Sequence, residues 1–462
     1  MIKCPINIKL FMGHFLITRG EFVKIKFIEI IKYISLFFGI ILLFNLLLLI
    51  VCLIPSSSIE GKVKDSSKIL LEEGLLFTLP YSSNVQNNNM TDSIIINEAY
   101  SIDNEKPVES YLTMRKNYNK DYTITELKDI SGEGISFISG DIKGIGETFD
   151  PVNELSDFLD GNVHTSLEYG KYWHGYMVLY RPLLALYDIS QIRILQLVIF
   201  VILLITFLIL IYKRLGLGFS LIFLYSFLFY DYFHVSYSLE SGPIFMVTMV
   251  STIILLIRID KIKNIAKYIF VVACITNYVD FLTVPLITLA TPLIIYVLYA
   301  QKNNNLNFKE IFILIFKSVV AWCVGYALTW FMKWFLFDII LNGNLIKTAI
   351  TQILYRSSRE NYYSKYNIFE LIGSFLKPYL FILIISIVIL LIKRPKRNEI
   401  ISIVPLVIIG AMPVVWIFVF TNHSLLHSFF TYRHMIILMY SSLSLIYLII
   451  KDQKIMLKKG LK

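Results

Sequence analysis

Long apolar segments alternate with short polar ones along most of the chain. A segment of about 18 or more apolar residues can cross a bilayer core of roughly 30 Å as a helix. The first such run covers residues 33–54, and nine more lie near 192–212, 216–233, 243–258, 265–280, 282–300, 311–335, 371–392, 400–420 and 433–450. The pattern predicts an all-α polytopic membrane protein with about 10 transmembrane helices.

One long polar segment, residues 55–190, follows the first apolar run. From 55 to 188 it holds 21 acidic residues against 11 Lys or Arg, and few basic residues are expected in an external loop. We expect a large external loop of mixed α/β or mostly helical structure. Its last part, EYGKYWHGYMVLYRPLLALYD at 168–188, is strongly aromatic. This part predicts an interfacial helix, although a simple membrane-surface anchor has the same pattern.

Basic residues mark the opposite side of the membrane. The N-terminal segment 1–32, the short segments after alternate apolar runs, and the tail 452–462 are all basic. By the positive-inside rule these parts are cytoplasmic. The run 33–54 is longer than the apolar region of a signal peptide and predicts an uncleaved first transmembrane helix. Residues 191–451 then form the multi-helix transmembrane domain of a cell-membrane protein, and both termini are cytoplasmic.

Composition supports the membrane assignment and excludes other classes. The chain is 56% hydrophobic and 16% charged, whereas soluble proteins carry roughly a quarter charged residues. The net charge of +10 lies in the short basic segments, so the predicted partners are membrane lipids and no nucleic acid is expected. The four cysteines are far apart in the sequence, and neither a disulfide framework nor a cysteine metal site is expected.

The predicted external loops, and the outer end of the apolar run 311–335, nevertheless hold a set of cationic and imidazole side chains. The set consists of His174, Arg181, Lys333, Arg356, Arg359, His423, His427 and Arg433. Arginine can hold phosphate in a bidentate manner and lysine adds a compact charge, so the set predicts a phosphate or pyrophosphate site. Ordinary contacts of long side chains with lipid phosphates are the alternative.

Two of these histidines have the spacing of a metal-binding pair. His423 and His427 are four residues apart and would share one face of a helix. No glutamate lies between them and no third ligand is evident nearby, so hydrogen bonding is the favoured role. We predict no metal site, and the sequence leaves open whether a divalent cation takes part.

Two acidic residues of the polar segment are candidates for a general base. In MTDSIIINEAYS, residues 90–101, Asp92 precedes an apolar patch and Glu98 follows six residues later. A carboxylate within hydrogen-bond reach of a hydroxyl can accept its proton. The alternative is that both are solvated, like most acids of such a loop.

The layout and three short blocks resemble the GT-C superfamily of integral membrane glycosyltransferases. The blocks are YWHGYMVLYRPLL at 172–184, NYVDFLTVPLITL at 277–289 and NHSLLHSFFTYR at 422–433. The resemblance implies transfer of a sugar from a polyprenyl-phosphate carrier to a cell-envelope glycan or lipid at the external face. It implies Asp92 as the base, with Glu98 as second choice, and the cation set as the holder of the carrier phosphate.

Two other functions fit the same layout. The chain could transport or flip a lipid-linked saccharide, or serve as a non-catalytic envelope protein. A transporter is expected to carry polar residues near the middle of several helices, whereas here they gather at the predicted external ends. For the transferase we expect Asp92, His174, Arg356, His423 and Arg433 to converge around one cavity that opens outward and toward lipid.

Overall fold

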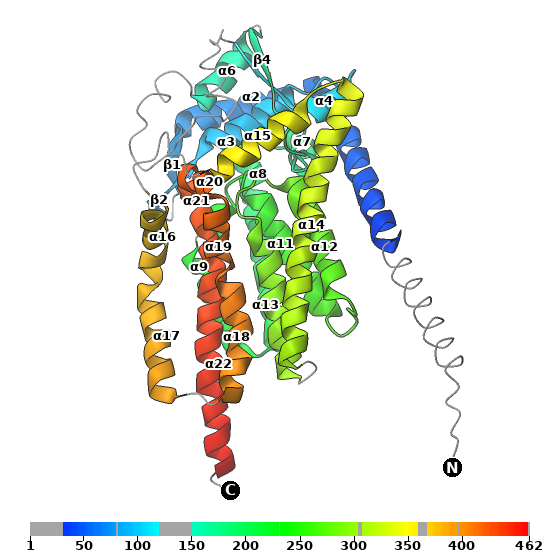
Figure 1. The fold of residues 1–462 in the computed structure, drawn as a ribbon. Coiled ribbons are helices and arrows are strands. Elements are labelled where there is room, and N and C mark those ends of the chain that lie inside the picture. The colour runs from blue at the N-terminus through cyan, green and yellow to red at the C-terminus, as the bar shows by residue number, and fades with distance from the viewer. Residues whose placement is uncertain are drawn as a thin grey trace, which may run out of the picture. The chain divides into compact units, whose positions relative to one another are not determined.

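A computed structural model describes residues 31–79, 82–119, 150–161, 163–230, 232–303, 307–358, 367–394 and 397–460. The chain divides into two units, Met1–Leu47 and Leu48–Lys462. The described part of the first unit is helical and belongs to the helix Ile31–Cys52. The second unit holds all the labelled helices and strands (Figure 1).

Five helices are long and apolar enough to cross a membrane. They are Ile31–Cys52, Ile189–Arg214, Phe308–Leu341, Ile368–Lys393 and Ser428–Lys451. Five shorter apolar helices are Leu217–Phe229, Gly242–Arg258, Ile265–Val279, Leu286–Lys302 and Ile403–Val419. Each of the ten predicted apolar runs coincides with one of these helices. The helices fit an all-α membrane protein, whereas the number of crossings stays a prediction.

The helices after residue 188 run largely side by side in Figure 1. Their bounds are α8 Ile189–Arg214, α9 Leu217–Phe229, α10 Tyr232–Val235, α11 Gly242–Arg258, α12 Ile265–Val279, α13 Leu286–Lys302, α14 Phe308–Leu341, α15 Leu345–Ser357, α16 Ile368–Leu376, η1 Lys377–Tyr379, α17 Leu380–Lys393, α18 Arg397–Gly410, α19 Met412–Val419, α20 Thr421–Leu426, α21 Ser428–Thr431, η2 Tyr432–Met435 and α22 Ile436–Gly460. Helix α15 lies across one end of this group (Figure 1).

The polar segment forms a small layer at that same end. Its elements are α2 Ser56–Glu73, β1 Leu76–Leu79, β2 Ser82–Asn88, α3 Asn89–Tyr100, α4 Pro107–Thr113, β3 Arg115–Tyr118, α6 Pro151–Asp160, β4 Thr165–Glu168 and α7 Met177–Leu184. The strands form two antiparallel pairs, β1 with β2 and β3 with β4. The predicted interfacial helix is therefore reduced to α7, and β4 and an irregular aromatic stretch precede it.

Helices α12 and α14 approach each other closely because α14 carries a glycine at their crossing. A Cβ at Gly325 would lie 2.8 Å from the carbonyl oxygen of Phe270 and 3.1 Å from the Cβ of Ala273. Small residues at such crossings allow membrane helices to pack backbone to backbone. The close crossing brings the C-terminal end of α12 next to the second half of α14.

A buried arginine joins the polar layer to the membrane helices. Arg193, near the start of α8, is 2% exposed. Its Nη1 donates to Glu73 Oε2 at 2.8 Å, and its Nη2 donates to Asn89 Oδ1 at 2.7 Å and to Asp92 Oδ2 at 2.8 Å. Asp92 in turn accepts a hydrogen bond from the backbone N–H of Leu239 at 3.0 Å. One guanidinium therefore connects α2, α3 and α8, and through Asp92 also the loop before α11.

We expect Arg193→Met to destabilise the protein strongly. The change leaves Asp92 buried without its cation, and breaking a buried ion pair costs about 3–5 kcal/mol. Arg214→Met is the matched control on the same helix, because Arg214 pairs with Asp260 at 2.8 Å in a half-exposed position, where a pair contributes about 0–1 kcal/mol. Thermal unfolding in detergent measures both variants, and equal shifts in Tm would contradict the central role of Arg193.

Candidate functional site

The aromatic stretch before α7 is held on α14 by indole hydrogen bonds. Trp330 and Trp334 of α14 both donate to the carbonyl oxygen of Lys171, at 2.7 and 3.0 Å. In return Trp173 donates to the carbonyl oxygen of Thr329 at 2.7 Å. Buried indole N–H groups need such acceptors. These bonds fix the stretch that carries Tyr169, Tyr172 and His174.

Glu98, Tyr176 and His174 form a buried proton-sharing network. The hydroxyl of Tyr176 donates to Glu98 Oε2 at 2.7 Å and also contacts His174 Nδ1. His174 Nε2 lies 2.8 Å from the carbonyl oxygen of Tyr169, which can only accept, so Nε2 carries a proton. His174 Nδ1 lies 3.3 Å from Glu98 Oε2, and both side chains contact the hydroxyl of Tyr176.

Arg356 of α15 is held by a neutral histidine. Its Nη1 lies 2.7 Å from His423 Nδ1, and His423 Nε2 lies 2.9 Å from the carbonyl oxygen of Leu282. Arginine can only donate, so Nδ1 accepts and Nε2–H donates to Leu282. Burial, reinforced by repulsion from His427 and Arg356, lowers the pKa of His423 well below its usual range. The guanidinium of Arg356 therefore keeps its charge and most of its donors.

His427 lies beside this pair and contacts the rings of two neighbours. Its ring is stacked on Phe430, with centroids 5.1 Å apart, and lies 4.8 Å from the ring of His423. Burial lowers the pKa of His427 to about 3, and the charges of Arg356 and Lys171 act in the same direction. No group of three His, Cys, Asp or Glu side chains that could hold a metal ion occurs within the described residues.

Asp280 lies at the start of the turn between α12 and α13, where one predicted apolar run ends and the next begins. Its Oδ1 accepts from the backbone N–H of Thr283 at 2.9 Å and from the hydroxyl of Thr283 at 2.6 Å, and its Oδ2 accepts from the hydroxyl of Tyr326 at 3.2 Å. Burial nevertheless raises the pKa of Asp280 to about 6. The side chain stabilises the turn and has both oxygens occupied.

Glu240 lies in the loop before α11 and is not among the residues that the sequence pattern indicates. The residue is partly exposed, and Thr91 forms a hydrogen bond with its side chain. Burial and then repulsion from Asp92 raise the pKa of Glu240 to about 7, whereas attraction by Arg433 opposes the shift. The sequence feature that could have indicated Glu240 is a single acidic residue in a short polar loop, FHVSYSLESGP, between two apolar runs.

These side chains belong to one electrostatic group. Glu240 interacts with Asp92, Asp280 and Arg433, and Tyr169 interacts with Arg356, Glu98 and Glu240. We call this group the polar cluster: Asp92, Glu98, His174, Glu240, Asp280, Arg356, His423, His427 and Arg433, with the tyrosines at 169, 172 and 176. The five residues expected to converge belong to this group, but none of them lines the apolar groove described below, so their convergence around one cavity stays a prediction.

Two of the predicted phosphate ligands are buried cations that donate to backbone carbonyl oxygens in this conformation. Arg181 is fully buried and donates to the carbonyl oxygens of Ala99 and Ile54. Lys333 is fully buried and donates to the carbonyl oxygen of Tyr111 at 2.6 Å. The remaining one of the set, Arg359, lies outside the described residues.

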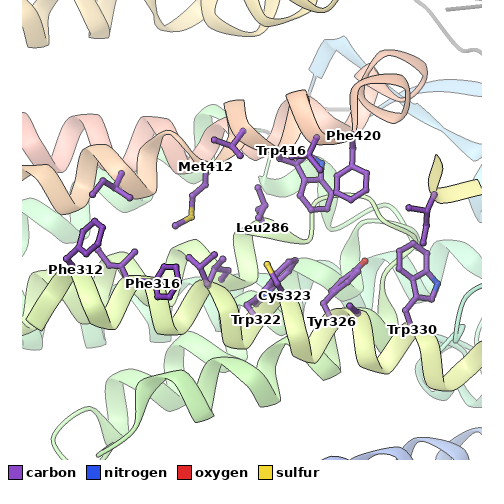
Figure 2. Close-up of a pocket in the computed structure, with 18 residues that line it drawn as sticks. Leu286, Phe312, Phe316, Trp322, Cys323, Tyr326, Trp330, Met412, Trp416 and Phe420 are labelled. Atoms are coloured by element: carbon purple, nitrogen blue, oxygen red, sulfur yellow. The ribbon is translucent and has the colours of Figure 1, made fainter. Parts of the chain in front are cut away.

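An apolar groove of about 620 Å³ lies between α14 on one side and α18 and α19 on the other. Figure 2 shows side chains of α14, from Phe312 to Trp330, facing Met412, Trp416 and Phe420. The groove opens on the outer surface of the helices, because Phe316 and Val415 on its edge are 64% and 59% exposed. At one end lie Tyr326 and Trp330 together with Ile353 of α15 and Phe420.

The groove and the polar cluster share a boundary. Tyr326 lines the groove and donates its hydroxyl proton to Asp280. Trp330, also in the lining, stacks on Tyr172 with centroids 5.8 Å apart. Ile353 is one turn before Arg356 on α15. A molecule that filled the groove would therefore have one end beside the cluster.

Acid should destabilise the fold through His427. Its folded pKa of about 3 lies below the ordinary value of about 6.5, so its contribution to stability is complete above pH 6.5 and is lost as pH falls toward 3. At about pH 5 the loss is about 2 kcal/mol for one such histidine. His427→Phe should flatten the dependence of Tm on pH, and His164→Phe, at an exposed position, should not. A dependence unchanged by His427→Phe would contradict the buried neutral state.

Comparisons with known proteins give no relative for this chain: no family model, no curated protein and no solved structure matches it. The function is therefore inferred from the groove, the polar cluster and the sequence.

Proposed function

We propose that the chain is a GT-C-like glycosyltransferase that moves a sugar from a polyprenyl-phosphate donor to a cell-envelope acceptor at the external membrane face. The observation that supports it most is the apolar groove that ends beside the polar cluster. A donor of this class has a long apolar chain, a phosphate and a sugar in series. The groove can hold the apolar chain, and Arg356 and the carboxylate of Asp280 lie next to residues at its end.

The groove suits the apolar part of the donor. Its lining is formed by aliphatic and aromatic side chains and by Cys323 and Met412, and such a lining binds hydrocarbon by excluding water. It opens on the outer surface of helices that are apolar enough to lie in a membrane. A polyprenyl chain could therefore enter sideways from the bilayer.

Arg356 and Arg433 are the cations that we assign to the phosphate. Arg356 is partly exposed and has one nitrogen bonded to His423. Arg433 is also partly exposed and lies over the ring of Tyr432, 5.2 Å from its centroid. A guanidinium offers five donors in a planar fork, so both can still bind phosphate oxygens. The neighbouring histidines stay neutral and leave the positive charge to the arginines.

The proposed orientation follows from the ends of the helices. Helices α8, α11 and α13 end in the basic residues Arg214, Arg258 and Lys302, which favour the cytoplasmic side. The polar cluster lies near the opposite ends of the same helices. We therefore propose ten crossings of the cell membrane, with both termini cytoplasmic and the cluster external.

Arg356→Ala should weaken donor binding without unfolding the protein. A hydrogen bond to a charged group contributes about 1.5–3 kcal/mol, which corresponds to an increase of about 10- to 150-fold in KM for the donor. The assay is transfer of labelled sugar in proteoliposomes. Lys347→Ala is the matched control, because Lys347 is an exposed cation on the same helix. Saturable donor binding with no transfer by the wild type would favour translocation of a lipid-linked saccharide.

A bulky side chain in the groove should act only on donors with a long chain. Ala327 lines the groove, so Ala327→Trp should reduce transfer from a full-length polyprenyl donor about tenfold or more and should affect a short-chain analogue much less. Val324→Trp is the control, because Val324 lies on the same helix, is 44% exposed and does not line the groove. Equal loss with both donors would argue against a chain in the groove.

A further inference from the structure

The four carboxylates of the polar cluster, Asp92, Glu98, Glu240 and Asp280, differ in their hydrogen-bond partners and in their exposure. Asp92 has one oxygen bonded to Arg193 and the other to the backbone N–H of Leu239. Asp280 has its two oxygens bonded to Thr283 and Tyr326. Both carboxylates are also buried, at 1% and 4% exposed, so a hydroxyl from outside the cluster has little access to them.

Glu98 is unsuitable for a different reason. Its side chain is fully buried, and Oε2 accepts from Tyr176 and lies 3.3 Å from His174 Nδ1. A base must be within hydrogen-bond reach of the hydroxyl that it deprotonates, and a fully buried carboxylate beneath Tyr176 offers no such reach.

Glu240 is the exception among these four. It is partly exposed, whereas Asp92, Glu98 and Asp280 are 1%, 0% and 4% exposed. Thr91 contributes a hydrogen bond to its side chain, and a single threonine leaves room for a further donor, since an ionised carboxylate has about four acceptor positions. A hydroxyl that approaches the cluster can therefore reach this side chain.

The loop that carries Glu240 is rigidly placed. Gln196 of α8 donates to the carbonyl oxygens of Ser236 and Ser238 at 2.7 and 3.0 Å. The next residue, Leu239, is held by Asp92. On the other side Gly242 leaves space for Gln196, because a Cβ there would lie 2.3 Å from Gln196 Nε2. Such positioning is what a general base requires, since small displacements cost large factors in rate.

The charges around Glu240 set its proton affinity. Asp92 and Asp280 repel its charged form and Arg433 attracts it, and the phenols of Tyr169, Tyr172 and Tyr176 lie within electrostatic range. With burial as the largest cause, the pKa of Glu240 is raised to about 7. A general base works best when its pKa lies near the operating pH.

We propose that Glu240 is the general base of the transfer reaction, with Asp92 as the residue that positions its loop. This inference rests on the proposed function. The acceptor oxygen forms a bond to the anomeric carbon of the sugar while the bond from that carbon to the carrier phosphate oxygen breaks. The phosphate leaves with the bonding electron pair beside Arg356 and Arg433, and Glu240 takes the proton of the acceptor hydroxyl.

The variant Glu240→Gln tests this assignment in the proteoliposome assay. We expect kcat to fall about 10²- to 10⁴-fold with little change in KM for the donor. The wild-type rate should rise with pH through about 7, and the residual rate of the variant should lose this rise. Glu105→Gln, an exposed Glu at the edge of the polar layer, is the matched control and should behave as wild type.

Reaction with a hydrophobic carbodiimide gives a second readout that needs no turnover. The reagent modifies protonated carboxyl groups in apolar surroundings, and peptide mass spectrometry locates the adduct. Glu240 should be modified below about pH 7 and protected above it, whereas Asp92, held by Arg193, should not react. Loss of the adduct in Glu240→Gln, with Glu105→Gln unchanged, identifies the site.

The outcomes separate this inference from the proposed function. Wild-type transfer together with an undiminished rate and pH profile in Glu240→Gln would overturn the role of Glu240 and leave the transferase standing. Absence of Glu240 modification at any pH would also overturn it. No transfer by the wild type from any polyprenyl-phosphate sugar would overturn the proposed function and the base assignment together.

Discussion

The buried charge of Arg193 is the constraint on which the arrangement of the polar layer depends. A guanidinium at the start of an apolar helix cannot stay buried without anions and acceptors around it. Glu73 and Asn89, near the ends of two other helices, supply them together with Asp92. Compensation of this one charge fixes the polar layer against α8. The second oxygen of Asp92 then extends the constraint to Leu239.

Hydrogen-bond partners also limit which charged groups of the polar cluster remain accessible. His423 accepts from Arg356 and is therefore neutral, so it orients the guanidinium without adding a competing cation. Glu98 Oε2 accepts from Tyr176 and lies 3.3 Å from His174 Nδ1 within the buried network. The cluster is left with two partly exposed arginines and one partly exposed carboxylate, Glu240. These are the groups that an incoming ligand can still engage.

Much of the secondary structure could be predicted, because apolar runs and turn residues are local signals. The separation of the apolar runs 265–280 and 282–300 was correctly predicted, and α12 and α13 are separate helices. The pairing of Asp92 with Arg193, 101 positions apart, was not, since charge partners depend on tertiary packing. For the same reason the sequence could not separate Arg181 and Lys333, which bond to backbone carbonyls, from Arg356. Glu240 was missed because a lone acid in a short loop has no distinctive spacing.

The boundary between groove and cluster explains why similar cations have different roles. A lipid chain in the groove would end beside Tyr326, Trp330 and Ile353, so its head group could reach only what lies near those residues. Arg356, one turn after Ile353 on α15, meets this condition. Lys333 lies one turn after Trp330 on α14, yet its amine is turned to the carbonyl oxygen of Tyr111 and is fully buried. The distance of a side chain from the end of the groove and its burial, more than its charge, determine whether it can act on a ligand.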